Sequence, residues 1–186
     1  MDGTRWLSED EQRVWRDYLE ATQLLHAQLG RDLDDSAHDL VMTEYELLVR
    51  LSEAPGWAVR MSELADDLVH SRSRLTHTAA RMEARGLLRR EACADDRRGV
   101  LAVMTDAGFA ALAAAAPLHV TGVREHLFDQ LEPEEAAVLG RAFARVSAHL
   151  RGGEPGCADR AAEAASLGAA QGAAQVAVAP NSSPSR

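Results

Sequence analysis

The chain has 186 residues, and its composition is globular but rich in alanine, with only 4% aromatic residues. This length fits one domain with extensions. The sequence has no uninterrupted apolar run of about 18 residues and no apolar leader at its start. We therefore expect a mainly helical, cytoplasmic protein without a membrane segment.

Metal, redox and catalytic motifs are not found in the sequence. Cys93 and Cys157 do not form a CxxC pair, so reduced thiols are expected rather than a disulfide framework or a zinc site. The chain also has no glycine-rich phosphate loop, GxSxG motif or HExxH motif. We predict no cofactor, no metal and no catalytic residues, and we do not expect an enzyme.

The distribution of charge is more informative than its total. A formal net charge of −9 argues at first against a polyanionic partner, because phosphate neutralisation supplies much of nucleic-acid affinity. From 72 to 98, however, eight arginines face four acidic residues, so this segment carries a net charge of +4. Such a local cluster is typical of a DNA-contacting surface.

Helical periodicity begins near the N-terminus. Apolar residues at spacings of three and four predict one long helix over 9–38, with Ser8 and Glu11 forming a capping box at its start. A second helix is predicted to begin at Thr43, with Glu46 at the matching capping position. The Ala-Pro-Gly turn that follows should end this helix.

The most informative stretch is the helix predicted over 71–85. An extended piece at 57–60 and a short helix over 62–68, capped by its first residue, precede it. Three apolar side chains share one of its faces, at spacings of four and three: Leu75, Ala79 and Met82. Three polar side chains share the opposite face: Arg74, His77 and Arg81. Gly86 can supply a left-handed cap at the C-terminal end.

A β-hairpin and an alanine-rich helix follow. Two short strands over 87–93 and 100–104 are joined by a polar loop that ends in glycine, as a hairpin requires. The next helix begins after Thr105, a capping residue. Pro117 either kinks this helix or divides it from a continuation to about residue 130.

A last helix is predicted to begin near Glu132, with Pro133 just inside its start, and to run to Leu150. Beyond it the composition changes. Residues 151–186 are mostly Ala, Gly, Ser and Pro, so we expect a mobile tail to which no function is assigned.

The helix over 71–85 meets the requirements of a DNA-recognition helix. A major groove admits one α-helix, whose N-terminal and outward side chains read the DNA. The predicted DNA contacts are Ser71, Arg72, Ser73, Arg74, Thr76, His77 and Arg81. The alternative for this face alone is an ordinary solvated surface. The short helix before it and the hairpin after it favour DNA contact.

The hairpin loop supplies a second set of predicted DNA contacts, which comprises Asp96, Arg97 and Arg98. An arginine at this tip would enter a minor groove, where narrow A·T-rich segments concentrate negative potential. Asp96 would orient Arg98 through a salt bridge. The alternative is a polar turn whose charges only face solvent.

Five short segments together carry a family resemblance: 61–65, 71–76, 81–90, 95–100 and 104–108. The most specific part is the Asp-x-Arg wing, followed by a strand and Thr-x-x-Gly. Over about residues 5 to 150, the chain resembles the multiple antibiotic resistance regulator (MarR) family. It departs from the family at His77, where an arginine is frequent, so any contact there would depend on pH.

The resemblance implies a mainly α fold with a small β wing, a winged helix-turn-helix, in an intertwined helical homodimer. Dimerisation helices over 5–40 and 105–150 would flank a DNA-binding domain over 41–104. The implied function is that of a ligand-responsive repressor on a palindromic operator in double-stranded DNA, although the residues do not decide between repression and activation. Apolar stripes on the terminal helices, which a small winged domain cannot cover, independently favour a dimer.

Members of this family often bind small aromatic ligands between the dimerisation helices and the winged domain. The candidates for lining such a pocket are Trp15, Tyr18, Tyr45 and Trp57. Core packing is the alternative for these aromatic residues. The alternative for the whole chain is a winged-helix protein-interaction module without DNA binding, which should present an apolar centre rather than a cationic face.

Overall fold

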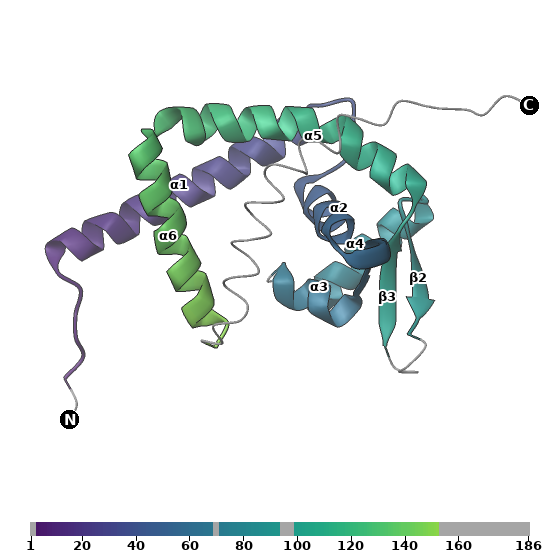
Figure 1. The fold of residues 1–186 in the computed structure, drawn as a ribbon, viewed down its shortest axis with the longest axis horizontal. Helices are drawn as coiled ribbons and strands as arrows, with labels where there is room; N and C mark the ends of the chain where they lie inside the picture. Colours follow the sequence, from purple (N-terminus) through teal and green to yellow (C-terminus); the bar gives the residue numbers. More distant parts are fainter. Residues whose placement is uncertain (1–2, 69–70, 94–98, 153–186) are drawn as a thin grey trace, which may run out of the picture. The chain divides into compact units, whose positions relative to one another are not determined.

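The computed structural model describes residues 3–68, 71–93 and 99–152, which fall into two compact units, Met1–Leu127 and Phe128–Arg186. The elements of the first unit are α1 (Glu9–Asp34), α2 (Met42–Glu53), β1 (Ala58–Arg60), α3 (Met61–Asp67), α4 (Arg72–Ala84), β2 (Leu88–Ala92), β3 (Val100–Met104) and α5 (Asp106–His126) (Figure 1). The second unit contains α6 (Pro133–Leu150). The predicted mainly α fold with a small β wing is confirmed.

The capping box at the start of α1 is confirmed. The Ser8 amide donates to Glu11 Oε2 at 2.8 Å, and the Glu11 amide donates to Ser8 Oγ at 3.2 Å. The helix ends at Asp34, earlier than the predicted residue 38. It ends there because the amide and hydroxyl of Ser36 both donate to the Leu33 carbonyl and close the last turn.

The predicted N-caps of α2 and α3 are wrong by two residues each. Helix α2 begins at Met42, with Val41 as its N-cap, so Thr43 and Glu46 do not form a capping pair. Helix α3 begins at Met61 rather than after Ser62. It does so because β1 continues through Arg60, and the chain enters the helix directly from the strand.

Three short antiparallel strands form one sheet in the order β1-β3-β2. The extended piece predicted at 57–60 is the edge strand β1, and it places Ala58 opposite Val103. The predicted hairpin is formed by β2 and β3, with Leu88 opposite Met104. Because the central strand β3 also pairs with β1, the wing hairpin is attached to the segment that leads into α3.

Helix α4 is oriented by its apolar face, as predicted. Leu75, Ala79 and Met82 are fully buried. After the helix, Gly86 has φ of +72°, and the Leu87 amide donates to the Met82 carbonyl at 3.0 Å. This is the glycine-dependent reversal that the sequence predicts, and it directs the chain from α4 into β2.

Helix α5 is continuous through Pro117, so the division considered from the sequence does not occur. The helix tolerates the lost hydrogen bond because it packs against α1 and α2, and it buries Leu112 and Ala115 before the proline and Gly122 after it. Asp106–Gln130 is long and apolar enough to cross a membrane by length and composition. Leu112 and Ala115 of α5 belong to the core of the first unit, although only 22% of the apolar window is buried in the single chain.

The core of the first unit lies where α2, α3, α4 and the sheet meet. Its fully buried large apolar side chains are Leu33, Leu40, Leu47, Leu48, Leu51, Leu64, Leu75, Met82 and Leu88. In the second unit, α6 begins at Pro133 as predicted and ends at Leu150. Several of its apolar side chains are exposed, among them Val138, Val146 and Leu150.

Candidate nucleic-acid interface

The first turn of α4 is open to solvent and electropositive. Ser71 is the N-cap, and its hydroxyl accepts a hydrogen bond from the Arg74 amide at 3.4 Å. Arg72 and Arg74 are exposed, and no acidic side chain of the described residues pairs with them. Because a helix N-terminus itself carries partial positive charge, this turn attracts anions such as phosphates.

The predicted recognition residues differ in the hydrogen bonds that they make within the protein. Ser73, Thr76 and His77 are exposed, as predicted. The Thr76 hydroxyl donates to the Arg72 carbonyl at 2.7 Å, so its oxygen remains available only as an acceptor. His77 extends the exposed face beyond Arg74.

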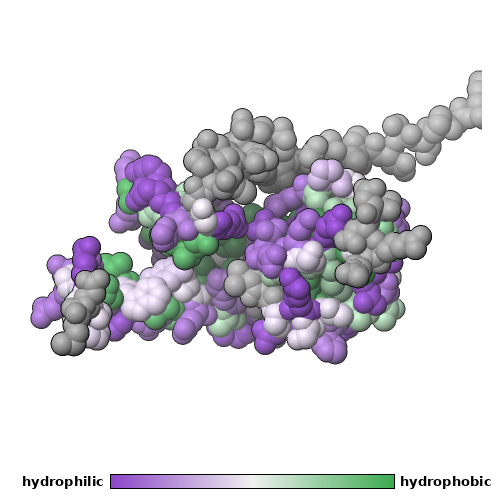
Figure 2. Space-filling model, turned by 90° about the horizontal axis from the view of Figure 1, so that it is seen from below, coloured by the Kyte–Doolittle hydropathy of each residue, from purple (hydrophilic) through white to green (hydrophobic). Residues whose placement is uncertain are grey.

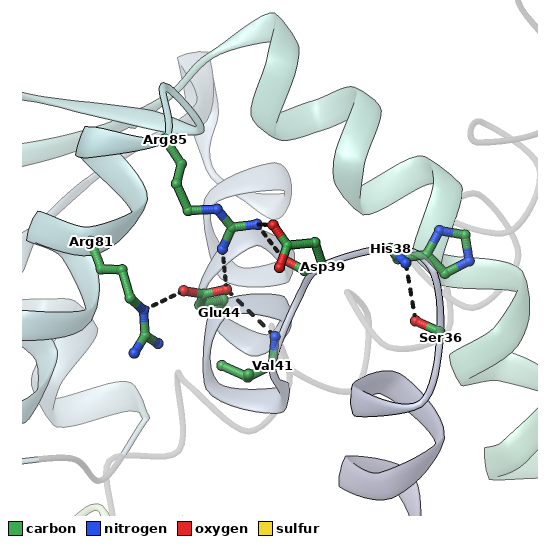
Figure 3. A network of polar contacts seen from close by, with 7 residues as sticks. All are labelled: Ser36, His38, Asp39, Val41, Glu44, Arg81 and Arg85. Carbon is green, nitrogen blue, oxygen red and sulfur yellow. Dashed lines mark hydrogen bonds and ion pairs between the residues drawn. The ribbon is translucent and has the colours of Figure 1, made fainter.

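Arg81 is placed differently from the other predicted contacts. Its Nε donates to Glu44 Oε1 at 2.7 Å, which draws the guanidinium toward the start of α2 (Figure 3). The side chain is still 55% exposed. Arg81 is therefore both an outward residue of α4 and a partner of a buried carboxylate.

Glu44 belongs to a network that the sequence analysis missed. Its side chain is only 1% exposed, and its Oε2 accepts from Arg85 Nη1 at 2.8 Å. Arg85 Nη2 also donates to the carboxylate of Asp39 at 3.0 Å and to its backbone carbonyl (Figure 3). Glu44 shares a helix face with Leu47, Leu48 and Leu51. An acidic residue on an apolar helix face is the sequence pattern that could have revealed this network.

Ion pairs neutralise part of the positive charge predicted for residues 72–98. Arg90 holds the Glu83 carboxylate through Nε at 2.8 Å and Nη2 at 2.6 Å, and this hydrogen bonding lowers the pKa of Glu83. Arg89 pairs with Glu91 at 2.5 Å. Among the described arginines of α4 and the hairpin, those without an acidic partner are Arg72 and Arg74, which lie together at the start of α4.

The wing is described only at its base. The predicted contacts Asp96, Arg97 and Arg98 lie outside the described residues. Below them, the Cys93 amide donates to the Gly99 carbonyl at 3.0 Å and continues the hairpin pairing. Cys93 itself is buried.

The four aromatic residues predicted to share a ligand pocket lie in three separate places. Trp15 and Tyr18 stack on each other on α1, with ring centroids 5.6 Å apart, and both are exposed. Trp57 stacks on Phe109 at 4.8 Å. Tyr45 is buried, and of the four it alone lines an open pocket next to α2.

That space is a cavity of about 410 Å³ between α1, α2, the end of α3 and α5. Tyr45 contacts the ring of His119 there, with centroids 4.4 Å apart. Burial raises the pKa of Tyr45 to about 12 and lowers the pKa of His119. The His119 Nδ1 atom is buried, with no hydrogen-bond partner in the described part of the chain.

The cavity also contains charged side chains, which include Arg50 and Asp67. It could therefore hold a small molecule with both an aromatic and a polar part. Elsewhere in the described ranges, no cluster of three His, Cys, Asp or Glu residues is arranged to hold a metal ion.

A short helix, an exposed cationic helix and an antiparallel hairpin, in this order, define a winged helix-turn-helix protein. The family model described as "MarR family" matches residues 38–99. The transcriptional regulator PecS of Dickeya dadantii is 32% identical over 126 residues, which are 66% of this chain and 75% of PecS. The chain belongs to the MarR family.

Solved structures agree with this assignment. AbsC, a MarR family transcriptional regulator of Streptomyces coelicolor, is 46% identical with a TM-score of 0.73, and the match covers 80% of this chain and 99% of AbsC. Sco3205 of the same organism, solved in complex with DNA, is 44% identical with a TM-score of 0.74, covering 81% of this chain and 93% of Sco3205.

Proposed function

We propose that this chain is a transcriptional regulator that binds double-stranded DNA through α4 and the wing. The observation that carries the proposal is that Arg72 and Arg74, at the exposed N-terminal turn of α4, have no acidic partner among the described residues. Family membership supports it, because Sco3205 was solved in complex with DNA. In this proposal α4 lies in the major groove, and Arg97 and Arg98 of the wing contact the adjacent minor groove.

The regulator acts as a homodimer in the cytoplasm, on a palindromic operator. Several large apolar side chains of α1 face solvent in the single chain, including Val14 at 68% and Trp15 at 52% exposure. Figure 2 shows green hydrophobic patches among purple hydrophilic ones on the left, where the N-terminal half of α1 lies. A second copy related by two-fold symmetry would bury the helices over 5–40 and 105–150 and pair two winged domains.

A small ligand would control DNA binding, and its binding would relieve repression. The cavity that contains Tyr45 and His119 supports this part of the proposal, because it touches both α1 and α3, the helix that precedes α4. A planar ligand with a hydrogen-bond donor would satisfy the buried Nδ1 atom of His119. Trp15, Tyr18 and Trp57 lie away from this cavity.

Fluorescence anisotropy tests DNA binding, with labelled DNA that flanks the chain's own gene and salt varied from about 50 to 200 mM. We expect steeply salt-dependent binding, weakened about tenfold by Arg74→Ala and by Arg98→Ala. The matched control is Arg160→Ala, which removes the same charge from the segment over 151–186, outside α4, the wing and both predicted dimerisation helices. Absence of binding to this DNA and to a genomic fragment pool would favour a protein-interaction module.

A further inference from the structure

The buried carboxylate of Glu44 has no part in the DNA-binding surface as assigned above. It lies near the start of α2, and burying such a charge costs free energy unless it is paired and hydrogen-bonded. Both oxygens are paired, one with Arg81 at 2.7 Å and the other with Arg85 at 2.8 Å (Figure 3). The compensation therefore comes from the last turn of α4 and its C-cap.

The contact with Glu44 uses only one edge of the Arg81 guanidinium. The bond is made by Nε, and the two terminal nitrogens have no partner among the described residues. An α-helix turns about 100° per residue, so Arg81 lies within about 60° of Arg74 and His77 around the axis of α4. The unoccupied nitrogens of Arg81 therefore extend the exposed row toward the C-terminal end of the helix.

Arg85 anchors the carboxylate from the other side. Besides Glu44, it binds the carboxylate and carbonyl of Asp39, which has φ of +51° in the connection between α1 and α2. Aspartate adopts this left-handed conformation more readily than most residues do. Arg85 thus joins three segments, and it holds Glu44 through the oxygen that Arg81 does not use.

We propose that Glu44 is a positioning residue for DNA recognition, which holds Arg81 so that its two terminal nitrogens bind one DNA phosphate. Arg81 lies about 13 Å along the helix from Arg72, beyond the first turn that reads base edges, so a phosphate is the expected partner. A fixed guanidinium matches two phosphate oxygens at once and loses less side-chain entropy on binding. This inference rests on the proposed function, because it requires α4 to contact DNA.

The test uses a DNA fragment that the wild-type protein enriches from genomic DNA, and measures affinity by anisotropy. We expect about tenfold weaker binding for Arg81→Gln, for Arg81→Lys and for Glu44→Gln. Lysine keeps the charge but lacks the planar fork that Glu44 orients. The double variant Glu44→Gln with Arg81→Gln should bind no worse than Arg81→Gln alone. The control Glu53→Gln removes the same charge from an exposed ion pair of α2 and should stay within about twofold.

Two results would overturn the inference while leaving the proposed function intact. One is wild-type affinity for Arg81→Lys, which would show that only charge matters. The other is independent, multiplying losses for Glu44→Gln and Arg81→Gln. Thermal melting shows which variants fold, and if Glu44→Gln does not fold, the comparison of Arg81→Lys with Arg81→Gln decides. Failure of the wild-type protein to enrich any fragment would instead refute the proposed function.

Discussion

Gly108→Ala should destabilise the protein although it improves helix propensity. Gly108 lies in the first turn of α5, where alanine is favoured by about 1 kcal/mol. A Cβ atom there would stand 2.0 Å from the Leu87 carbonyl oxygen and 3.0 Å from Met104 Cγ. The nearest neighbour is backbone, and its carbonyl already accepts the Thr105 amide at 3.2 Å. The α4–β2 connection would therefore have to move.

Overpacking of this kind costs about 1–3 kcal/mol, and a contact this short lies at the upper end. After the propensity gain is subtracted, we expect a loss of about 2 kcal/mol, which lowers Tm by about 4–8 °C. Differential scanning calorimetry measures this shift. The control is Gly30→Ala in α1, where a Cβ atom meets nothing within 4 Å, so Tm should rise slightly. A Gly108→Ala protein as stable as wild type would refute the packing argument.

Three other predictions concern stability and assembly. The Thr105 hydroxyl accepts a hydrogen bond from the Gly108 amide at 3.0 Å and donates one to the Gly86 carbonyl at 2.7 Å. Thr105→Ala should therefore lower the free energy of unfolding in urea by about 1–2 kcal/mol, and Thr105→Ser should restore most of this loss. Burial lowers the pKa of His119 below its ordinary 6.5, so the unfolded chain takes up this proton first, and stability should fall as pH drops below 6.5. The urea midpoint of His119→Gln should fall less over this range, and an identical decline would contradict the assignment. Val14→Glu should convert a dimer into a monomer in sedimentation velocity, because Val14 is exposed in the single chain and a second copy would cover it; a dimer that survives would place the interface elsewhere.

Local patterns in the sequence predicted the elements that carry the candidate site. The 4-and-3 spacing of Leu75, Ala79 and Met82 predicted which face of α4 is buried, and hence that Arg74 and His77 face outward. Gly86 was predicted as a left-handed cap, and its φ is +72°. These features depend on neighbours a few residues away, so spacing is sufficient to predict them.

The polar network could not be predicted from spacing alone. Glu44 binds Arg81, 37 residues later, and Arg85, 41 residues later, and the pairing depends on how α2 packs against α4. The charge count over 72–98 therefore overstated the available positive charge, since two of its arginines are held by acids outside that segment. The same reason explains why the four aromatic residues predicted to line a pocket lie in three separate places in the single chain, because their grouping in space follows from tertiary packing.

The most direct test of the central claim is selection from sheared genomic DNA by the purified wild-type protein, Arg74→Ala and Arg160→Ala, followed by sequencing of the retained fragments. The wild-type protein and Arg160→Ala should enrich the same few fragments, with inverted half-sites about 34–36 Å apart, and Arg74→Ala should lose this enrichment. Equal enrichment by Arg74→Ala and the wild-type protein would contradict the assignment of α4 as the DNA-reading helix.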